Sequence, residues 1–529
     1  MSAMTQEQPR LMRLHPADTV AVALSDIPEG FIHLMPDGTR IRAAAPIARG
    51  HKMALTPMAE GDPVLRYGFP IGRASRAITP GEHVHAHNLV SAIALNEDYR
   101  WQPDPGVLAT CTPVNTEGTA APSATDILLS TESSDTQPAS VRTFDGYRRA
   151  DGSVGIRNEI WIVPTVGCVN RLAEALAAEA NRRHAGRTDG FFAWTHPYGC
   201  SQLGDDHEIT QRLLAGLVRH PNAAGVLVLG LGCENNLITS FREVLGPVDG
   251  TRVRFLEAQS VQDEQAAGLA LLDDLAEFAA TQCREPVPLS ALRIGLKCGG
   301  SDGLSGITAN PLAGMVSDRL IAVGGTALLT EVPEMFGAET ILMNRCRTES
   351  DFSRLVDLID GFKDYYVRHG QPVNENPSPG NREGGITTLE EKSLGCIQKG
   401  GTSPVAAILH YGEPVRTHGL NLLEGPGNDI VSLTALSASG AHLVLFTTGR
   451  GTPLGGPVPT VKIATNDALA ENKPHWIDFN AARLLREAPE QVADDLLEMV
   501  VDIASGRHQT RNEHNGYREI AIFKNGVTL

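Results

Sequence analysis

The stretch IWIVPTVGCVNRLAEAL, residues 160–176, decides the fold class. A continuous apolar run leads to a turn at Gly167-Cys168, and a helical pattern follows. The same order of apolar run, turn and helix recurs in residues 191–219 and begins again at residues 226–233. Apolar strands without alternation, each followed by an amphipathic helix, predict a parallel sheet that helices cover on both faces.

The texture of the rest of the sequence divides the chain into four regions. Short alternating segments between Pro- and Gly-containing turns predict a small β-rich module over residues 11–100. Residues 101–143 are interpreted as a flexible linker, because 112–140 are mainly Thr, Ser, Pro, Ala, Glu and Asp. Residues 144–285 form a first predicted α/β domain. Residues 286–529 form a second, since apolar runs and helical patterns continue there.

Composition is typical of a cytoplasmic enzyme. Of the 529 residues, 42% are hydrophobic, and the net charge of −17 predicts a surface that repels nucleic acid and acidic lipid. No apolar run approaches the roughly 20 residues that span a bilayer, and residues 1–10 lack the apolar core of a signal peptide. Eight cysteines are too few for a disulfide scaffold, so we expect reduced thiols. The assembly state, a homo-oligomer included, stays open.

Four cysteines each follow a predicted strand. Cys168, Cys200, Cys233 and Cys298 are spaced 32, 33 and 65 residues apart, about one, one and two strand–helix units. Because open α/β sheets bind ligands at the carboxyl ends of their strands, these thiols are candidate ligands for iron, zinc or an iron–sulfur cluster. Strand ends fan over more than about 10 Å, so two or three cysteines at one centre are expected. The alternative is that each cysteine is a small buried hydrophobe.

His196 and His207 lie on either side of Cys200 and are candidate catalytic residues. An imidazole can abstract or donate a proton near neutral pH. His207 could equally be an exposed residue at the start of the next helix.

A second group of histidines, His83, His85 and His87, lies in the β-rich module. On a strand, alternation puts the three imidazoles on one face with neighbours about 6.6 Å apart, which makes His85 and His87 candidate metal ligands. All three bind one ion only if the strand bends, because the outer two are about 13 Å apart. The alternative is a solvated polar face on an edge strand.

Two glycine-rich turns, at residues 299–306 and 447–452, follow apolar runs in the last domain. Backbone N–H groups of such turns cradle anions, and an arginine can pair a carboxylate bidentately. Neither turn has the spacing of a phosphate-binding loop or a dinucleotide fingerprint, so carboxylate binding is favoured. Candidate substrate contacts are Gly299, Gly300, Ser301, Arg450 and Thr452, and candidate catalytic carboxylates are Asp302 and Glu331.

The chain resembles the altronate and galactarate dehydratase family. The motifs that carry the resemblance lie at residues 155–159, 164–170, 196–207, 230–236, 298–311, 376–381 and 447–453. The last residue of the motif at 376–381, Asn381, joins the candidate substrate contacts. The front module is similar to the SAF domain of these enzymes, including Gly50-His51-Lys52. Nearly the whole chain is covered, apart from about 112–140, and the histidine run and residues 200–207 resemble the altronate branch.

The resemblance implies dehydration of D-altronate to 2-dehydro-3-deoxy-D-gluconate and water, a step of galacturonate breakdown that requires iron(II) or manganese(II). It extends to sulfolactate sulfo-lyase, whose SAF and α/β parts are separate chains. Three alternatives stay open: galactarate dehydration, release of sulfite from sulfolactate, and a catalytically inactive protein that binds a sugar acid.

Dehydration of such an acid removes the C2 proton and expels the C3 hydroxyl, and a metal that chelates the carboxylate stabilises the enediolate. We place this metal, as a single ion or as an iron–sulfur cluster, among Cys168, Cys200 and Cys233. His196 or His207 is the expected base or acid. The SAF module is expected to close over this crevice and bring His85 or His87 to it.

Overall fold

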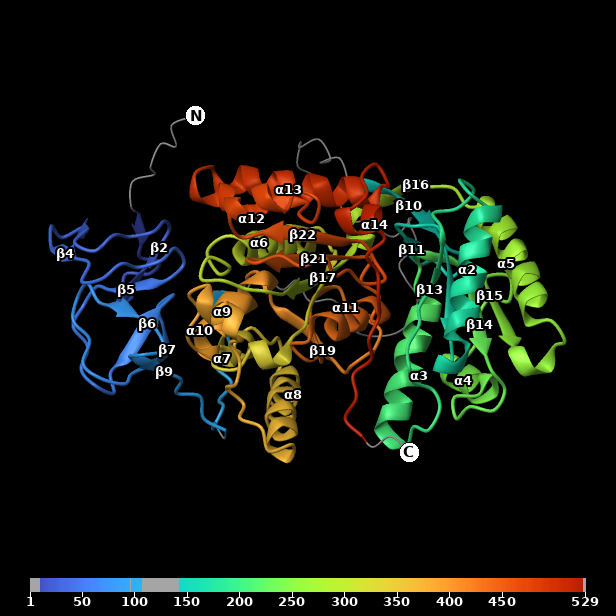
Figure 1. Ribbon diagram of the computed structural model, residues 1–529, viewed down its shortest axis with the longest axis horizontal. Coiled ribbons are helices and arrows are strands. Elements are labelled where there is room, and N and C mark those ends of the chain that lie inside the picture. Colours follow the sequence, from blue (N-terminus) through green and yellow to red (C-terminus); the bar gives the residue numbers. More distant parts are fainter. Residues whose placement is uncertain (1–9, 96, 107–141, 527–529) are drawn as a thin grey trace, which may run out of the picture.

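The computed structural model describes residues 10–95, 97–106 and 142–526. These residues form three units in a row, with the small β-rich unit at one end and the largest sheet in the middle (Figure 1). The linker segment expected at 112–140 lies outside the described residues. Among the helices that are described, none is long and apolar enough to cross a membrane.

The N-terminal unit consists of short antiparallel strands, as the turn-rich sequence predicts. The first sheet contains β1 (Leu11–Met12), β2 (Val20–Ala23), β5 (Lys52–Ala54) and β8 (His83–Val84). The others are β6 (Pro63–Arg66), β7 (Phe69–Ala74) and β9 (Leu89–Val90) in one sheet, and the pair β3 (Ile32–Leu34) and β4 (Arg40–Arg42).

The second unit is a four-stranded parallel sheet in the order β13-β12-β14-β15. Its elements are β12 (Glu159–Pro164), α2 (Asn170–Arg183), β13 (Phe191–Ala193), α3 (Gly204–Arg219), β14 (Ala223–Gly230), α4 (Ile238–Leu245), β15 (Val253–Glu257) and α5 (Glu264–Ala280). In β12, Ile160 and Ile162 pack with α2 and α5, while Trp161 and Val163 pack with α3 and α4. Both faces are therefore buried, which explains the continuous apolar run.

The third unit is a seven-stranded, wholly parallel sheet in the order β19-β20-β18-β17-β21-β22-β23. Its strands are β17 (Arg293–Cys298), β18 (Thr326–Leu329), β19 (Val405–Leu409), β20 (Gly419–Leu423), β21 (Leu443–Thr448), β22 (Thr460–Ala464) and β23 (Phe479–Asn480). Its helices are α6 (Ala309–Ala322), α7 (Glu339–Met343), α8 (Glu349–Arg368), α9 (Pro379–Glu383), α10 (Leu389–Cys396), α11 (Asp429–Ala438), α12 (Asp467–Asn472), α13 (Pro489–Ala504) and α14 (Arg511–Asn515). The predicted fold class is confirmed.

The order of strands defines one switch point in each parallel sheet. The chain leaves β17 for β18 on one side, and β21, on the other side of β17, leads away to β22. In the same way β12 leads to β13, while β14, on the other side of β12, leads to β15. At such a point the loops after two adjacent strands diverge and leave a crevice at the carboxyl ends. Cys298 ends β17, whereas Cys168 and Cys233 follow β12 and β14.

Two buried histidines lie where the two α/β units meet. His220 Nε2 is 3.0 Å from the carbonyl oxygen of Ala441, and Asn222 Nδ2 donates to the carbonyl oxygen of His442 over 2.9 Å. A small antiparallel sheet of β10 (Thr143–Arg148), β11 (Val154–Gly155) and β16 (Glu285–Pro288) lies along the same boundary. Burial lowers the pKa of His220 to about 3 and the pKa of His442 well below its usual value.

Stability is therefore expected to fall in mild acid. Both histidines are neutral in the folded protein, whereas the unfolded chain binds protons below its ordinary pKa of 6.5. The free energy of unfolding should decrease between pH 6.5 and about 3, by up to about 1.4 kcal/mol per pH unit for each histidine. Urea unfolding at a series of pH values in this range measures the free energy of unfolding. His220→Gln should flatten the slope and the exposed control His508→Gln should not; equal slopes in both would contradict the assignment.

Candidate active-site pocket

A pocket of about 740 Å³ opens at the carboxyl end of β17, at the switch point of the seven-stranded sheet. Its wall combines the turn after β17, the start of α11, and the segment before and within α9. The lining residues are Cys298, Gly299, Gly300, Glu334, Tyr366, Glu375, Asn376, Pro377, Ser378, Pro379, Asn381, Arg382, Lys392, Gly427, Asn428 and Asp429. A pocket with charged and amide side chains at this position is the place where an open α/β sheet binds its ligand.

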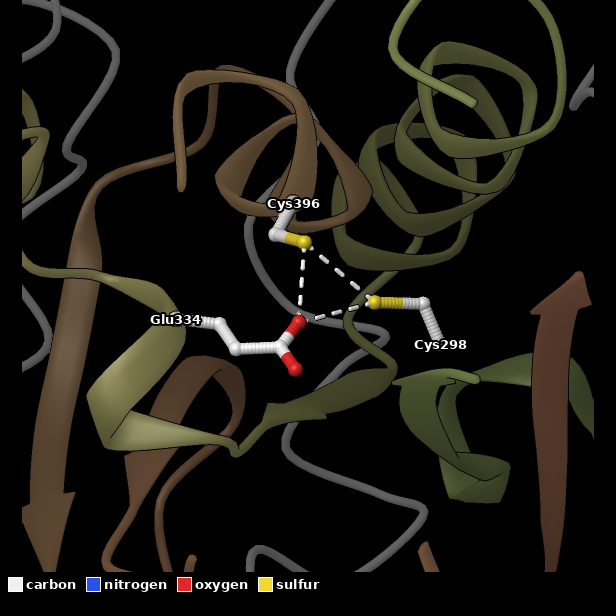
Figure 2. A group of neighbouring side chains, drawn as sticks. All are labelled: Cys298, Glu334 and Cys396. Atoms are coloured by element: carbon white, nitrogen blue, oxygen red, sulfur yellow. Dashed lines mark hydrogen bonds between the residues drawn. The ribbon is translucent and has the colours of Figure 1, made fainter. Parts of the chain in front are cut away.

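Two cysteines and a carboxylate meet at the pocket wall (Figure 2). The sulfurs of Cys298 and Cys396 are 3.3 Å apart, and Glu334 Oε2 lies 3.2 Å from the first and 3.0 Å from the second. All three side chains are buried. Among the residues that the structure describes, they are the one group of three His, Cys, Asp or Glu whose ligand atoms lie within 4.8 Å of one another.

Three lysines surround this group. Lys392 Nζ is 2.8 Å from Glu334 Oε1, and Lys399 Nζ is 3.0 Å from Glu331 Oε2. Lys297 forms ion pairs with Glu331 and, over 3.0 Å, with Asp429. Burial raises the pKa of Glu334, but the three ammonium groups outweigh it and hold the pKa well below the usual value. The hydrogen bond to Cys298 and burial raise the pKa of Cys396, so its thiol stays protonated without a metal.

Glu331 occupies a strained position beneath the group. It is a non-glycine residue with a φ of 73°, which costs of order 1–3 kcal/mol. Its carboxylate accepts the backbone N–H of Cys298 over 3.0 Å in addition to the two lysine contacts. Both oxygens are thus occupied, so Glu331 holds the end of β17 in place. Its predicted catalytic role stays untested.

The N-terminal unit, which is the module expected to be an SAF domain, contacts the third unit directly behind the pocket wall. Lys52 Nζ donates to the carbonyl oxygen of Gly385 over 2.8 Å and pairs with Glu391 Oε2 over 2.8 Å. Arg66 also pairs with Glu391. A Cβ on Gly303 would lie 1.9 Å from the carbonyl oxygen of Gly50, so the two backbones meet at glycines. This contact accounts for the Gly50-His51-Lys52 motif.

Removing the buried carboxylate of this contact is expected to be strongly destabilising. Burial raises the pKa of Glu391, but Lys52 and Arg66 outweigh it and hold the pKa at about 2. Glu391→Gln leaves two buried cations without their partner, which costs about 3–5 kcal/mol. Urea unfolding of the full chain measures the loss. Glu285→Gln, which removes an exposed pair with Arg148, is the control; an equal loss in both variants would refute the prediction.

The predicted cysteine ligands fall into two separate sheets. Cys298 belongs to the seven-stranded sheet, and Cys168, Cys200 and Cys233 lie at the carboxyl edge of the four-stranded one. Cys298 is buried and the other three are exposed. Cys298 therefore lies apart from the other three candidate ligands, because the strands of the two sheets do not pair. The expectation that the SAF module closes over these three is wrong, since its histidines contact Glu383 and Arg382 instead.

The predicted histidines of the first α/β domain lie outside the pocket. His196 Nε2 is 2.9 Å from the carbonyl oxygen of Pro164, and its Nδ1 accepts the N–H of Tyr198 over 3.2 Å. Burial lowers the pKa of His196 to about 4, so the ring is neutral and holds two loops together. His207 lies in the first turn of α3, half-buried. Their predicted roles as base or acid are not tested by this arrangement.

The histidine run of the SAF unit bends, because β8 ends at Val84 and Asn88 closes a turn onto His85. Strand alternation therefore stops at Val84, and the run has the bend that was named as the condition for binding one ion with all three histidines. The ring centroid of His83 comes within 5.5 Å of that of His85 and within 5.4 Å of that of His87. His85 Nε2 is 2.8 Å from the carbonyl oxygen of Arg382, and its Nδ1 accepts the N–H of Ala86. Metal binding by His85 and His87 stays a prediction.

Half of the predicted substrate contacts line the pocket, namely Gly299, Gly300 and Asn381. The buried hydroxyl of Ser301 has no hydrogen-bond partner within the described chain. Arg450 pairs with Glu383 over 2.9 Å, and the Thr452 hydroxyl accepts the N–H of Leu454. Asp302 accepts four hydrogen bonds, from Leu304, Ser305, Thr465 and Asn466, and so anchors the turn.

Sequence reasoning missed Cys396, Lys392 and Asp429. A signal was present, because Lys392, Cys396 and Lys399 are spaced four and three residues apart, which places them on one face of a helix. That face is buried against the pocket. Asp429 is the first residue of α11, a helix whose start faces the switch point.

The fold and the pocket together define an α/β enzyme whose front unit docks on the domain that carries the site. Family models match the SAF domain of altronate/galactarate dehydratase at residues 9–92 and the second domain of D-galactarate dehydratase/altronate hydrolase at 146–280. The C-terminal domain of D-galactarate/altronate dehydratase matches at 289–528. The chain therefore belongs to the altronate/galactarate dehydratase family, which makes it a hydro-lyase.

Relatives match over nearly the full length. The altronate dehydratase of Escherichia coli (strain K12) is 50% identical over 98% of this chain and 99% of its own length. That of Bacillus subtilis (strain 168) is 51% identical over the same shares. The galactarate dehydratase (L-threo-forming) of Escherichia coli (strain K12) is 32% identical over 97% of this chain and 96% of its own.

Proposed function

We propose that this enzyme dehydrates D-altronate to 2-dehydro-3-deoxy-D-gluconate and water in the pocket at the end of β17. The observation that carries the site is the meeting of Cys298, Glu334 and Cys396 with three lysines at the switch point of the sheet. The choice of altronate rests on identity, which is 50–51% to the two altronate dehydratases and 32% to the galactarate dehydratase.

The donor set fits a divalent iron or manganese ion. The two sulfurs are soft ligands and the carboxylate oxygen is a hard one, and a set that contains thiolates suits iron(II) better than magnesium. Charge supports the same assignment: Lys297, Lys392 and Lys399 balance Glu331, Glu334 and Asp429. If Cys298 and Cys396 lose their protons to bind a divalent cation, the two new negative charges cancel the two positive charges of the ion. When bound, such an ion supplies Lewis-acid stabilisation of negative charge on the substrate.

Asp429 is the proposed base. Its side chain lines the pocket and is 33% exposed, and Lys297 holds one oxygen at 3.0 Å. A Cβ on Gly299 would lie 2.5 Å from Asp429 Oδ2, so glycine at 299 leaves room for the carboxylate. In the proposed step Asp429 takes the C2 proton, and the electron pair forms the C2–C3 double bond as the C3–O bond breaks. The hydroxyl leaves as water, and the enol becomes the 2-oxo acid.

Lys392 is the proposed proton donor to the leaving hydroxyl. Burial lowers its pKa, but Glu334 outweighs this and raises the pKa above the usual value, so the group is an ammonium. Its Nζ also donates to Asn376 Oδ1 over 3.1 Å, which fixes its direction at the pocket wall. The N–H groups of Gly300 and Ser301 make no hydrogen bond to another described residue and are proposed to bind the substrate carboxylate.

A comparison of substrates tests this function. The full chain, purified without oxygen and supplied with iron(II), would receive D-altronate, galactarate or sulfolactate at equal concentration. We expect formation of a 2-oxo acid from altronate with a kcat/KM at least about tenfold above that for galactarate. Sulfite release from sulfolactate, or turnover of galactarate alone, would replace the proposal with the corresponding activity. No turnover of any acid would indicate a protein that only binds.

A further inference from the structure

We propose that the carboxyl edge of the four-stranded sheet holds an iron–sulfur cluster on Cys168, Cys200 and Cys233. This site is separate from the pocket at β17, which has its own ligand group, so it goes beyond the proposed function. Each thiol would lose its proton as its sulfur binds iron.

Packing does not explain these three cysteines. Cysteine is among the residue types most often buried, and Cys298, Cys346 and Cys396 are buried in this protein. Cys168, Cys200 and Cys233 are exposed instead, although the strands before Cys168 and Cys233 are fully buried and Phe191 in the strand before Cys200 is buried too. Exposed free thiols are readily oxidised, and binding of the sulfurs to a metal would protect all three.

The three loops that carry the thiols are joined by hydrogen bonds. The loop after β12 donates Gly167 N–H to the carbonyl oxygen of Tyr198 over 2.8 Å. In the loop after β13, the carbonyl oxygen of Gly199 accepts a hydrogen bond of 2.9 Å from the N–H of Asn236, which lies in the loop after β14. Thr165 donates its hydroxyl to Glu234 Oε1 over 2.8 Å, which joins the first loop to the third. The loops therefore converge, as a shared ligand requires.

Glycines let the loops approach this closely. Each of the three cysteines directly follows a glycine, namely Gly167, Gly199 or Gly232. A Cβ on Gly199 would lie 2.0 Å from the carbonyl oxygen of Thr165, and one on Gly167 would lie 2.9 Å from that of His196. Gly199 and Gly232 also have φ values of 98° and 125°, which side chains rarely adopt.

Three helices start near the thiols, and α3 also carries the carboxylates of Asp205 and Asp206 in its first turn. The helices α2, α3 and α4 begin two to five residues after Cys168, Cys200 and Cys233, respectively. None of the three has a side-chain cap at its first turn, whereas α5 of the same unit is capped by Asp263. Free N–H groups at helix starts attract anions, and a cluster with its thiolates is anionic. Gln259 Nε2 lies 3.6 Å from the Cys233 sulfur and can donate to it.

The spacing favours a cluster over a single ion. Among the described residues, no three ligand atoms at this edge lie within 4.8 Å of one another, which is the arrangement that one ion needs. A cluster binds each thiolate on a different iron, so its ligands stand further apart. Three thiolates would leave one iron of a [4Fe–4S] cluster without a protein ligand.

Reconstitution of the full chain tests the site. The protein would be treated without oxygen with equal amounts of ferrous and ferric iron and with sulfide, freed of unbound ions, and analysed for iron, acid-labile sulfide and visible absorbance. Wild type should bind iron and sulfide in equal amounts. Cys168→Ser, Cys200→Ser and Cys233→Ser should each retain at least about tenfold less sulfide. Cys283→Ser, at an exposed cysteine after α5, should match wild type.

Circular dichroism of each variant verifies that it is folded. Absence of sulfide from reconstituted wild type, or full sulfide in the three serine variants, overturns the proposal, as does binding of iron without sulfide. Cys298→Ser should keep its sulfide in this experiment. Loss of the pocket's metal and loss of the cluster are therefore distinguishable.

Discussion

Asparagine in place of Asp429 is expected to lower kcat on D-altronate by about 10²- to 10⁴-fold, the usual contribution of a general base. The substitution keeps the shape of the side chain beside Gly299 but removes the carboxylate that takes the C2 proton. KM should change little, because the N–H groups of Gly300 and Ser301, and not Asp429, are proposed to bind the substrate carboxylate. Steady-state rates of 2-oxo acid formation measure both constants.

Glu375→Gln is the matched control, since Glu375 also lines the pocket and its hydrogen bond with Arg382 uses the backbone carbonyl, which the substitution keeps. It should keep kcat within about threefold of wild type. If Asp429→Asn retained full kcat, or Glu375→Gln lost as much, the base would have to be sought elsewhere on the pocket wall.

Serine in place of Cys298 or Cys396 is expected to remove the bound divalent ion and to lower kcat/KM at least about 100-fold. Each substitution removes one of three ligands whose atoms lie within 4.8 Å of one another. Equilibrium dialysis of the full chain with manganese(II) measures metal binding at this site. Manganese(II) is used because bound iron could also belong to the proposed cluster. Loss of binding should accompany the loss of activity.

Cys346→Ser provides the control for a buried cysteine of the same unit. Its sulfur lies 3.7 Å from the carbonyl oxygen of Leu342 and contacts no member of the ligand group. This variant should bind manganese(II) as wild type does. Normal binding and activity in Cys298→Ser and Cys396→Ser together would disprove the metal site.

Local pattern predicted the fold well because both α/β sheets are parallel and buried on two faces. Apolar runs such as residues 160–163 are visible without any tertiary information, and each emerged as a strand. The position of Cys298 at the end of β17 and of the glycine turn after it followed from the same pattern. Prediction at this level needs only neighbours in the sequence.

The assembly of the site depends on contacts that the pattern does not contain. Lys52 meets Glu391 across 339 residues, and Cys298 meets Cys396 across 98. These distant pairs determine which sheet contains each strand-end cysteine. They also determine which domain the SAF unit contacts. The bend after Val84, which the sequence raised only as a condition for binding one ion, has a more local cause, since Asn88 closes a turn where alternation indicated a strand.

The most direct test of the account is the product formed in deuterium oxide. D-Altronate would be converted by the iron(II)-loaded chain, and the product examined by proton and carbon NMR. Removal of the C2 proton and loss of the C3 hydroxyl predict 2-dehydro-3-deoxy-D-gluconate with a single deuterium at C3. A product that retains its C3 hydroxyl, or unchanged altronate under conditions where the metal is bound, would contradict the account.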